Sequence, residues 1–110
     1  MFRDDRQIAR CNRALLAPLH LADLWTDEGP TPRARELLDQ GGGPMSSGEA
    51  LMLLVTFDLW NGRGNANLGR LLAVLDADRV RDLGTLLAAE ADGPDAVDAW
   101  LAEREGDGAV

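Results

Sequence analysis

Residues 46–62 read SSGEALMLLVTFDLWNG, an apolar segment with a helix start signal at one end and a helix stop signal at the other. Ser46 and Glu49 have the spacing of a capping box, in which the serine hydroxyl and the glutamate carboxylate satisfy backbone N–H groups at a helix N-terminus. Gly62 is typical of a helix C-terminus, because glycine readily adopts the left-handed conformation needed there. Apolar side chains occupy every side of the predicted helix, so we expect residues 46–60 to form a central helix that other helices enclose.

Helical periodicity continues on both sides of this segment, and no stretch alternates polar and apolar residues as a half-buried strand would. Pro18 is expected to end the first helix, and Gly93 with Pro94 opens the last one. The sequence therefore predicts an all-α fold of about five to seven short helices. We expect a single compact domain over residues 1–105, followed by a frayed, disordered acidic tail over residues 106–110. Side chains that commonly cap helices precede the other predicted helices: Asp4, Thr31, Asn65 or Asn67, and Asp76 or Asp78.

The apolar positions within each predicted helix indicate which side faces the core. Leu54 and Phe57 should be fully buried, since the central helix has no polar side to turn outward. Gly69 and Gly84 fall inside predicted helices, where glycine is unfavourable, so we expect close helix–helix contacts at both. The other inward positions, helix by helix, are Ile8, Cys11 and Leu15; Leu37 and Leu38; Leu68, Leu71, Leu72 and Leu75; Val80, Leu83 and Leu87; and Val97, Trp100 and Leu101.

The composition is that of a small globular domain with an acidic balance. The chain has 110 residues, of which 45% are hydrophobic and 27% charged, and its formal net charge is −8. All 11 basic residues are arginine, and this usage, with abundant alanine and glycine, is typical of GC-rich bacterial genomes. The first residues lack the apolar run of a secretory signal, and no apolar run approaches the roughly 20 residues of a membrane span. We therefore expect a protein of the bacterial cytoplasm that has no membrane association.

Charge is distributed unevenly along the sequence. Residues 82–110 carry a net charge of −7, so this quarter holds most of the acidic excess. Its carboxylates are either a solvated helix surface, partners for basic residues of the same chain, or a docking surface for another protein. The same three interpretations apply to a row of arginines that recurs every three or four residues in the first predicted helix. The candidate interaction residues are Asp92, Asp95, Asp98 and Glu105 in the acidic region, and Arg3, Arg6, Arg10 and Arg13 in the basic row.

The sequence gives no support for catalysis, and we expect no metal site and no cofactor. His20 is the lone histidine, and Pro18 separates it from Cys11, so a nucleophile and a base are not expected to meet. A single cysteine also excludes an internal disulfide. The aspartates at positions 76, 78 and 82 lack the central glycine and the ligand spacing of a calcium-binding loop, and helix capping explains them better. The chain has no lysine, which excludes a Walker-type phosphate loop.

Two polar features near residue 62 have a possible electrostatic role. The glycine-rich loop that includes Arg63, Gly64 and Asn65 precedes a predicted helix, and its free N–H groups with the arginine could form a modest anion site. An ordinary turn between helices is the alternative. Asp58 lies inside the most apolar helix, so a buried carboxylate there needs a partner. Arg70, or else Arg63, is the expected partner in a structural ion pair.

These observations favour a small, acidic, non-catalytic protein-interaction module with an adaptor or regulatory role. An alternative is an acidic mimic of nucleic acid that blocks a basic groove on a target protein. A second alternative is a DNA-binding regulator with a helix-turn-helix over residues 68–75 and 78–90, although the acidic balance disfavours direct nucleic-acid binding. The expected partner is another protein, and a homo-oligomer is compatible with the sequence.

Overall fold

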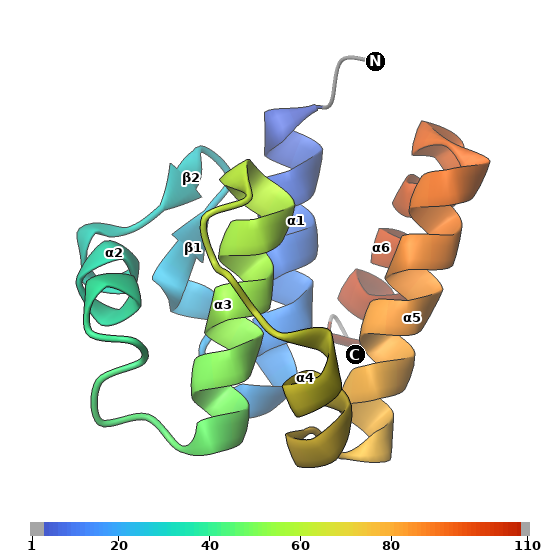
Figure 1. The fold of residues 1–110 in the computed structure, drawn as a ribbon. Helices are drawn as coiled ribbons and strands as arrows, with labels where there is room; N and C mark the ends of the chain where they lie inside the picture. The colour runs from blue at the N-terminus through green and yellow to red at the C-terminus, as the bar shows by residue number, and fades with distance from the viewer. Residues whose placement is uncertain (1–3, 109–110) are drawn as a thin grey trace. The chain divides into compact units, whose positions relative to one another are not determined.

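The computed structural model describes the backbone of residues 4–108 and the side chains of residues 4–105 (Figure 1). Six α-helices and two short 3-10 helices make up most of this described part, with one two-stranded sheet. The all-α prediction is therefore confirmed. The chain divides into two compact units, Met1–Leu75 (unit 1) and Asp76–Val110 (unit 2), which are described separately below. The single domain over residues 1–105 stays a prediction.

Unit 1 begins with α1, Asp5–Leu16, whose N-terminus is capped by Asp4 as expected. The Asp4 carboxylate accepts the N–H groups of Arg6 and Gln7 at 3.0 and 3.2 Å. After α1 the chain forms two 3-10 turns, η1 (Ala17–Leu19) and η2 (Ala22–Leu24). Pro18 lies in the first of them, because a proline ring does not fit the interior of an α-helix.

A small antiparallel hairpin follows, which the sequence analysis did not predict. Its strands are β1, Trp25–Thr26, and β2, Gly29–Pro30, with Trp25 opposite Pro30. The Thr26 hydroxyl stabilises the turn, since it donates to the Gly29 carbonyl at 3.1 Å and accepts the Glu28 N–H at 3.2 Å. Strands of two residues are too short to produce a period-2 pattern, which is why the segment resembles a loop in sequence.

Helix α2, Pro32–Asp39, begins at the predicted cap, where the Thr31 hydroxyl accepts the Ala34 N–H at 3.2 Å. A glycine-rich turn then leads to α3, Ser47–Asn61, which is the predicted central helix. Its capping box is present: the Glu49 N–H donates to the Ser46 hydroxyl at 3.2 Å, and the Ser46 N–H donates to the Glu49 carboxylate at 2.9 Å. Gly62 ends the helix in the left-handed conformation.

Helix α3 lies beside α1 and forms the core of unit 1 with it (Figure 1). The aromatic centre of this core is Trp25, whose ring centroid lies 5.2 Å from that of Phe57 and 5.4 Å from that of Trp60. Phe57 is buried as expected, but Leu54 is only half-buried, so that part of the prediction is wrong. The reason is that α3 has one side at the edge of the core, where the chain after Gly62 covers it incompletely.

Unit 1 ends with α4, Leu68–Val74, in which only part of the predicted apolar stripe is buried. Its N-terminal cap is Asn67, whose side chain accepts the Arg70 N–H at 3.0 Å. Leu71 and Leu75 face the core, whereas Leu68 and Leu72 are exposed. A two-turn helix at the edge of a unit has room for one buried row of side chains, and the predicted stripe was wider than that row.

Unit 2 is a pair of packed helices, α5 (Ala77–Asp92) and α6 (Pro94–Gly108). Asp76 caps α5 by accepting the Arg79 N–H at 2.9 Å. The buried row of α5 is Leu83, Leu86 and Ala89, and that of α6 is Val97, Trp100 and Leu101. The prediction for α6 is thus confirmed, whereas Leu87 is 50% exposed and Leu86 takes the position expected for it. Helix α6 continues to Gly108, into the predicted tail, and residues 109–110 lie outside the described residues.

The close helix contacts expected at Gly69 and Gly84 are absent from the described structure. A Cβ at Gly84 would meet no atom within 4 Å, and one at Gly69 would meet only the Asn67 side-chain oxygen at 3.3 Å. The glycine that does pack closely is Gly64, where a Cβ would overlap the Leu54 carbonyl. The close contact predicted for the helices is therefore found instead in the loop between α3 and α4.

Replacement of Phe57 by alanine tests the importance of the aromatic core. We expect F57A to lower the free energy of unfolding by about 3–5 kcal/mol, because it removes a buried ring in contact with Trp25. Leu87→Ala is the control, since an exposed leucine should contribute less than about 0.5 kcal/mol. Urea denaturation followed by circular dichroism measures both. A loss below about 1 kcal/mol for F57A would contradict the described core.

The capping box of α3 gives a prediction about pH. The hydrogen bond from the Ser46 N–H, followed by that with the Ser46 side chain, lowers the pKa of Glu49 below its ordinary 4.5. A lowered pKa in the folded state means that this stabilisation is fully present above the ordinary value and is lost as the pH falls through the lowered one.

We therefore expect the difference in stability between the wild type and Glu49→Gln to shrink as the pH falls below about 4.5. Urea denaturation of both proteins between about pH 7 and pH 3 measures this difference. Parallel pH profiles for the two proteins would show that the Glu49 carboxylate does not contribute through its charge.

Candidate interaction surfaces

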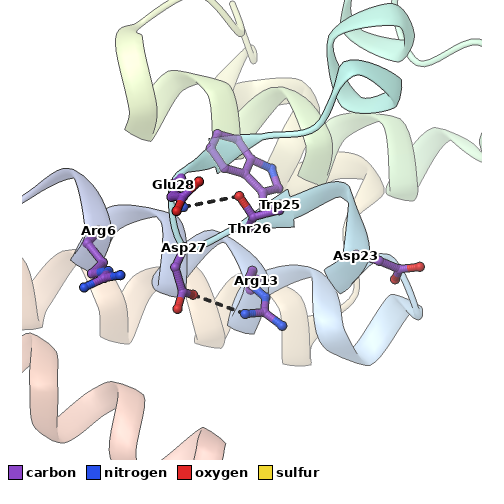
Figure 2. A pocket seen from close by; sticks show the side chains of 7 residues that line it. All are labelled: Arg6, Arg13, Asp23, Trp25, Thr26, Asp27 and Glu28. Carbon is purple, nitrogen blue, oxygen red and sulfur yellow. Dashed lines mark hydrogen bonds and ion pairs between the residues drawn. The ribbon is translucent and has the colours of Figure 1, made fainter.

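The arginine row of α1 is used partly inside unit 1. Arg13 forms an ion pair with Asp27 of the hairpin turn, with 3.2 Å between Nη1 and Oδ1 (Figure 2). Arg6 is exposed, Arg10 is half-buried and has an interaction within the chain, and Arg3 lies outside the described residues. The row is therefore not one uniform basic surface, because at least one of its guanidinium groups holds the hairpin against α1.

A surface pocket of about 520 Å³ lies between this row and the hairpin (Figure 2). Its lining carries charges of both signs, and Trp25, the large apolar side chain of the lining, is buried. An anion would have to compete with Asp27 for Arg13, so the pocket offers no single chemistry for a ligand. The residues that line it are Arg6, Arg13, Asp23, Trp25, Thr26, Asp27 and Glu28.

The acidic candidates lie on the exposed surface of unit 2. Asp92 is the last residue of α5, and Asp95 is in the first turn of α6. Asp98 and Glu105 are also exposed, but each has an interaction within the chain. All four residues are therefore exposed, and two of them also interact within the chain.

The one arginine of this acidic region, Arg104, joins the two helices of unit 2. Its Nη2 lies 3.1 Å from the Asp82 carboxylate and 3.3 Å from the Thr85 hydroxyl, and its guanidinium carbon lies 3.8 Å from the centre of the Trp100 ring. The Trp100 indole N–H also donates to Thr85 at 3.0 Å. Arg104 therefore ties α6 to α5 through Asp82 and Thr85, while the Trp100 ring of its own helix holds the guanidinium in place as a cation–π partner.

These contacts bear on the helix-turn-helix alternative. Of the side chains that a recognition helix over α5 would present, Asp82 and Thr85 are bound by α6. Arg79 pairs with Asp82 at 3.2 Å and Arg81 with Asp78 at 3.6 Å. Arg79, Asp82 and Thr85 are thus engaged within unit 2, whereas the exposed Arg81–Asp78 pair would compete only weakly with bases or phosphates.

The predicted partner of Asp58 is replaced by the loop that follows α3. The Asp58 carboxylate accepts the N–H groups of Asn65 and Ala66, both at 2.9 Å, and no ion pair joins it to Arg70 within the described part of the chain. The expectation of an Asp58–Arg70 pair is therefore wrong. Two backbone donors lie closer in sequence and are held in place by the loop, so they satisfy the carboxylate before a flexible arginine does.

The hydrogen bonds to Asp58 also show what occupies the predicted anion site at Arg63, Gly64 and Asn65. The loop does bind an anion through its backbone N–H groups, but that anion is the carboxylate of Asp58. Asn65 adopts a left-handed backbone conformation with φ of 55°, which directs these donors toward α3. An external anion would have to displace Asp58, so the loop functions as an internal latch.

Sequence reasoning missed a buried polar network in unit 1. Asn12 of α1 donates from Nδ2 to the Thr56 carbonyl at 3.0 Å, and the Trp25 indole N–H donates to the Thr56 hydroxyl at 3.2 Å. That hydroxyl donates in turn to the Leu53 carbonyl. All three side chains are buried. The only signal in the sequence is a polar residue on an otherwise apolar side of each helix.

Most exposed apolar side chains of unit 1 gather on α4. Leu68 is 69% exposed, Leu72 is 59% exposed, and Val74 is 40% exposed. Gly69, Arg70 and Ala73 are exposed as well, so every residue of α4 except Leu71 faces solvent. We call these six residues the α4 outer surface. This surface was not predicted, because Leu68 and Leu72 fit the apolar stripe expected to face the core.

The two residues considered for catalysis, Cys11 and His20, lie in different environments. Cys11 is buried in α1, whereas His20 is exposed and adopts a left-handed conformation with φ of 62°. Among the residues that the structure describes, no three His, Cys, Asp or Glu side chains are grouped to hold a metal ion. No described helix is both long enough and apolar enough to cross a membrane.

Comparison with protein families, with curated proteins and with solved structures finds no match to this chain.

Two substitutions distinguish the hydrogen bonds of Asp58 to the loop from the Asp58–Arg70 ion pair that the sequence predicted. We expect Asp58→Asn to lower the free energy of unfolding by about 1–2 kcal/mol, because it weakens two hydrogen bonds to a charged, half-buried acceptor. Arg70→Gln should change it by less than about 0.5 kcal/mol. Thermal and urea denaturation measure both. An equal loss in the two variants would instead support the ion pair that the sequence suggested.

Proposed function

We propose that this protein is a small non-catalytic interaction module that binds another protein through the α4 outer surface. The observation that supports this most directly is the exposure of Leu68 and Leu72, at 69% and 59%, side by side on one helix. Contiguous exposed apolar surface is uncommon on a soluble domain unless it meets a partner. The leucines of α1 and those at positions 51 and 53 of α3 are buried, so the exposure on α4 is not a general property of the fold.

The alternative of an acidic nucleic-acid mimic depends on a different set of residues. A mimic needs free carboxylates arranged like phosphates, and the candidates are Asp92, Asp95, Asp98 and Glu105. All four side chains are exposed, as a mimic requires. The net charge of −8 is compatible with a mimic, but it serves solubility equally well. Exposed acidic residues are common on any solvated surface, whereas neighbouring exposed leucines are not, so the apolar surface supports the interaction module better.

Two variants distinguish these functions once a partner has been captured from cells, identified by mass spectrometry and purified. We expect Leu68→Ser with Leu72→Ser to weaken binding of that partner by more than about 10-fold, because each leucine loses apolar burial worth about 1.5–3 kcal/mol. Leu87→Ser is the matched control, since it removes an exposed leucine from α5. Isothermal titration calorimetry measures the affinities, and circular dichroism verifies the helix content.

The second variant replaces Asp92, Asp95 and Asp98 by Asn and Glu105 by Gln. For the interaction module it should change affinity little and act mainly on the association rate. A neutralised variant that loses binding with its helices intact, while the leucine variant binds normally, would overturn our proposal in favour of the mimic. Tighter DNA binding by the neutralised variant would instead favour a DNA-binding regulator.

A further inference from the structure

The α4 outer surface has an internal order that follows from helix geometry. Successive residues of an α-helix are rotated by about 100°, so positions four apart lie on the same side. Leu68 and Leu72 therefore form one row, and Arg70 and Val74 form a second row on the opposite flank. The row between them consists of Gly69 and Ala73. Because Leu71 and Leu75 face the core, all three rows face outward.

The side chains of the middle row, Gly69 and Ala73, are small, so the backbone of a second helix can approach α4 closely there. Apart from its chain neighbours and the backbone of its own helix, a Cβ at Gly69 would meet only the Asn67 side-chain oxygen within 4 Å. Glycine weakens a helix relative to alanine, and the fold makes no use of it at this position. A glycine and an alanine between two rows of larger side chains form a shallow furrow along α4.

The charge of α4 itself has the opposite sign to that of the whole protein, since Arg70 is its one charged residue. No acidic residue occurs from position 59 to position 75, whereas Arg63 and Arg70 both do, in a chain with net charge −8. Both arginines are exposed, and neither forms an ion pair with another described residue. The α4 outer surface thus has an apolar flank and a basic flank.

We propose that the α4 outer surface binds an amphipathic helix whose apolar row lies on Leu68 and Leu72 and whose carboxylates lie on the Arg70 side. This rests on the proposed function and adds the chemistry of the partner. Charge complementarity selects an acidic helix over a basic one. A symmetric contact between the α4 outer surfaces of two copies fits less well, because each surface carries Arg70 and no carboxylate.

The test uses two synthetic helical peptides with identical leucine positions and a fluorescein label. One carries glutamate beside its apolar row, and the other carries lysine at the same positions. Fluorescence anisotropy measures their binding to the full chain at low salt. We expect the glutamate peptide to bind at least about 10-fold more tightly, which corresponds to about 1.4 kcal/mol. The overall charge of −8 favours the lysine peptide, so non-specific attraction predicts the opposite result.

Three variants locate the binding. Arg70→Glu should reverse the preference, whereas Arg35→Glu, which makes the same charge change at an exposed position of α2, should not. Gly69→Leu should weaken binding of the glutamate peptide by at least about 10-fold, because it fills the furrow while favouring the helix.

The outcomes separate the two proposals. The acidic-helix proposal is overturned if both peptides bind equally or if the lysine peptide binds more tightly. It is also overturned if Arg70→Glu leaves the preference unchanged. The proposed function survives that result if the captured partner still requires Leu68 and Leu72. Concentration-dependent dimerisation that is lost in Leu68→Ser with Leu72→Ser would assign the surface to a second copy and overturn the acidic-helix proposal as well. Both proposals are supported if Leu68→Ser with Leu72→Ser no longer binds the glutamate peptide while Arg35→Glu still prefers the glutamate peptide to the lysine peptide.

Discussion

The hydroxyl and the carbonyl of Thr56 hold three separate parts of unit 1 in register. The carbonyl accepts from Asn12 of α1, and the hydroxyl accepts from Trp25 at the start of the hairpin. Buried polar groups are costly unless paired, so α1, α3 and the hairpin have few alternative arrangements that keep the Asn12 and Trp25 N–H donors paired, although Oδ1 of Asn12 has no hydrogen-bond partner among the described residues. Apolar contacts alone tolerate small shifts of one helix along another. The polar network therefore fixes the positions that the surrounding leucines then stabilise by packing.

Features that depend on neighbouring residues could be predicted from the sequence. The caps at Asp4, Ser46 and Asp76 involve donors two or three residues away, so residue type and spacing suffice to identify them. The burial of consecutive leucines could not be resolved in this way. Leu86 and Leu87 fit the periodicity of α5 about equally well, and only the packing of α6 selects Leu86 for the core. Leu68 and Leu72 of α4 were likewise predicted to be buried, because periodicity alone does not show which apolar positions of a helix the rest of the fold covers.

Features that join distant residues could not be predicted from a single sequence. The pair Arg13–Asp27 spans 14 residues, and the bond between Asn12 and Thr56 spans 44. Nothing local in either segment indicates the partner, because the contact exists only once the helices have packed. The loop after α3 is an instructive intermediate: the sequence indicated that it offers donors to an anion, and the structure shows that Asp58 is the anion. Residue chemistry was informative there, while the identity of the partner required the fold.

The hydrogen bonds of Asp58 to the loop also lower the entropy that α4 can lose when a ligand binds to it. A seven-residue helix after a glycine-containing loop would ordinarily sample many orientations, and a ligand would have to reduce that freedom. Here the loop is bonded to α3 through Asn65 and Ala66, and Gly64 is packed against the Leu54 carbonyl. The conformational entropy of the surface is therefore already lost when the protein folds, before any ligand arrives. A ligand that binds α4 still loses translational and rotational freedom, but it does not also have to offset the ordering of the helix.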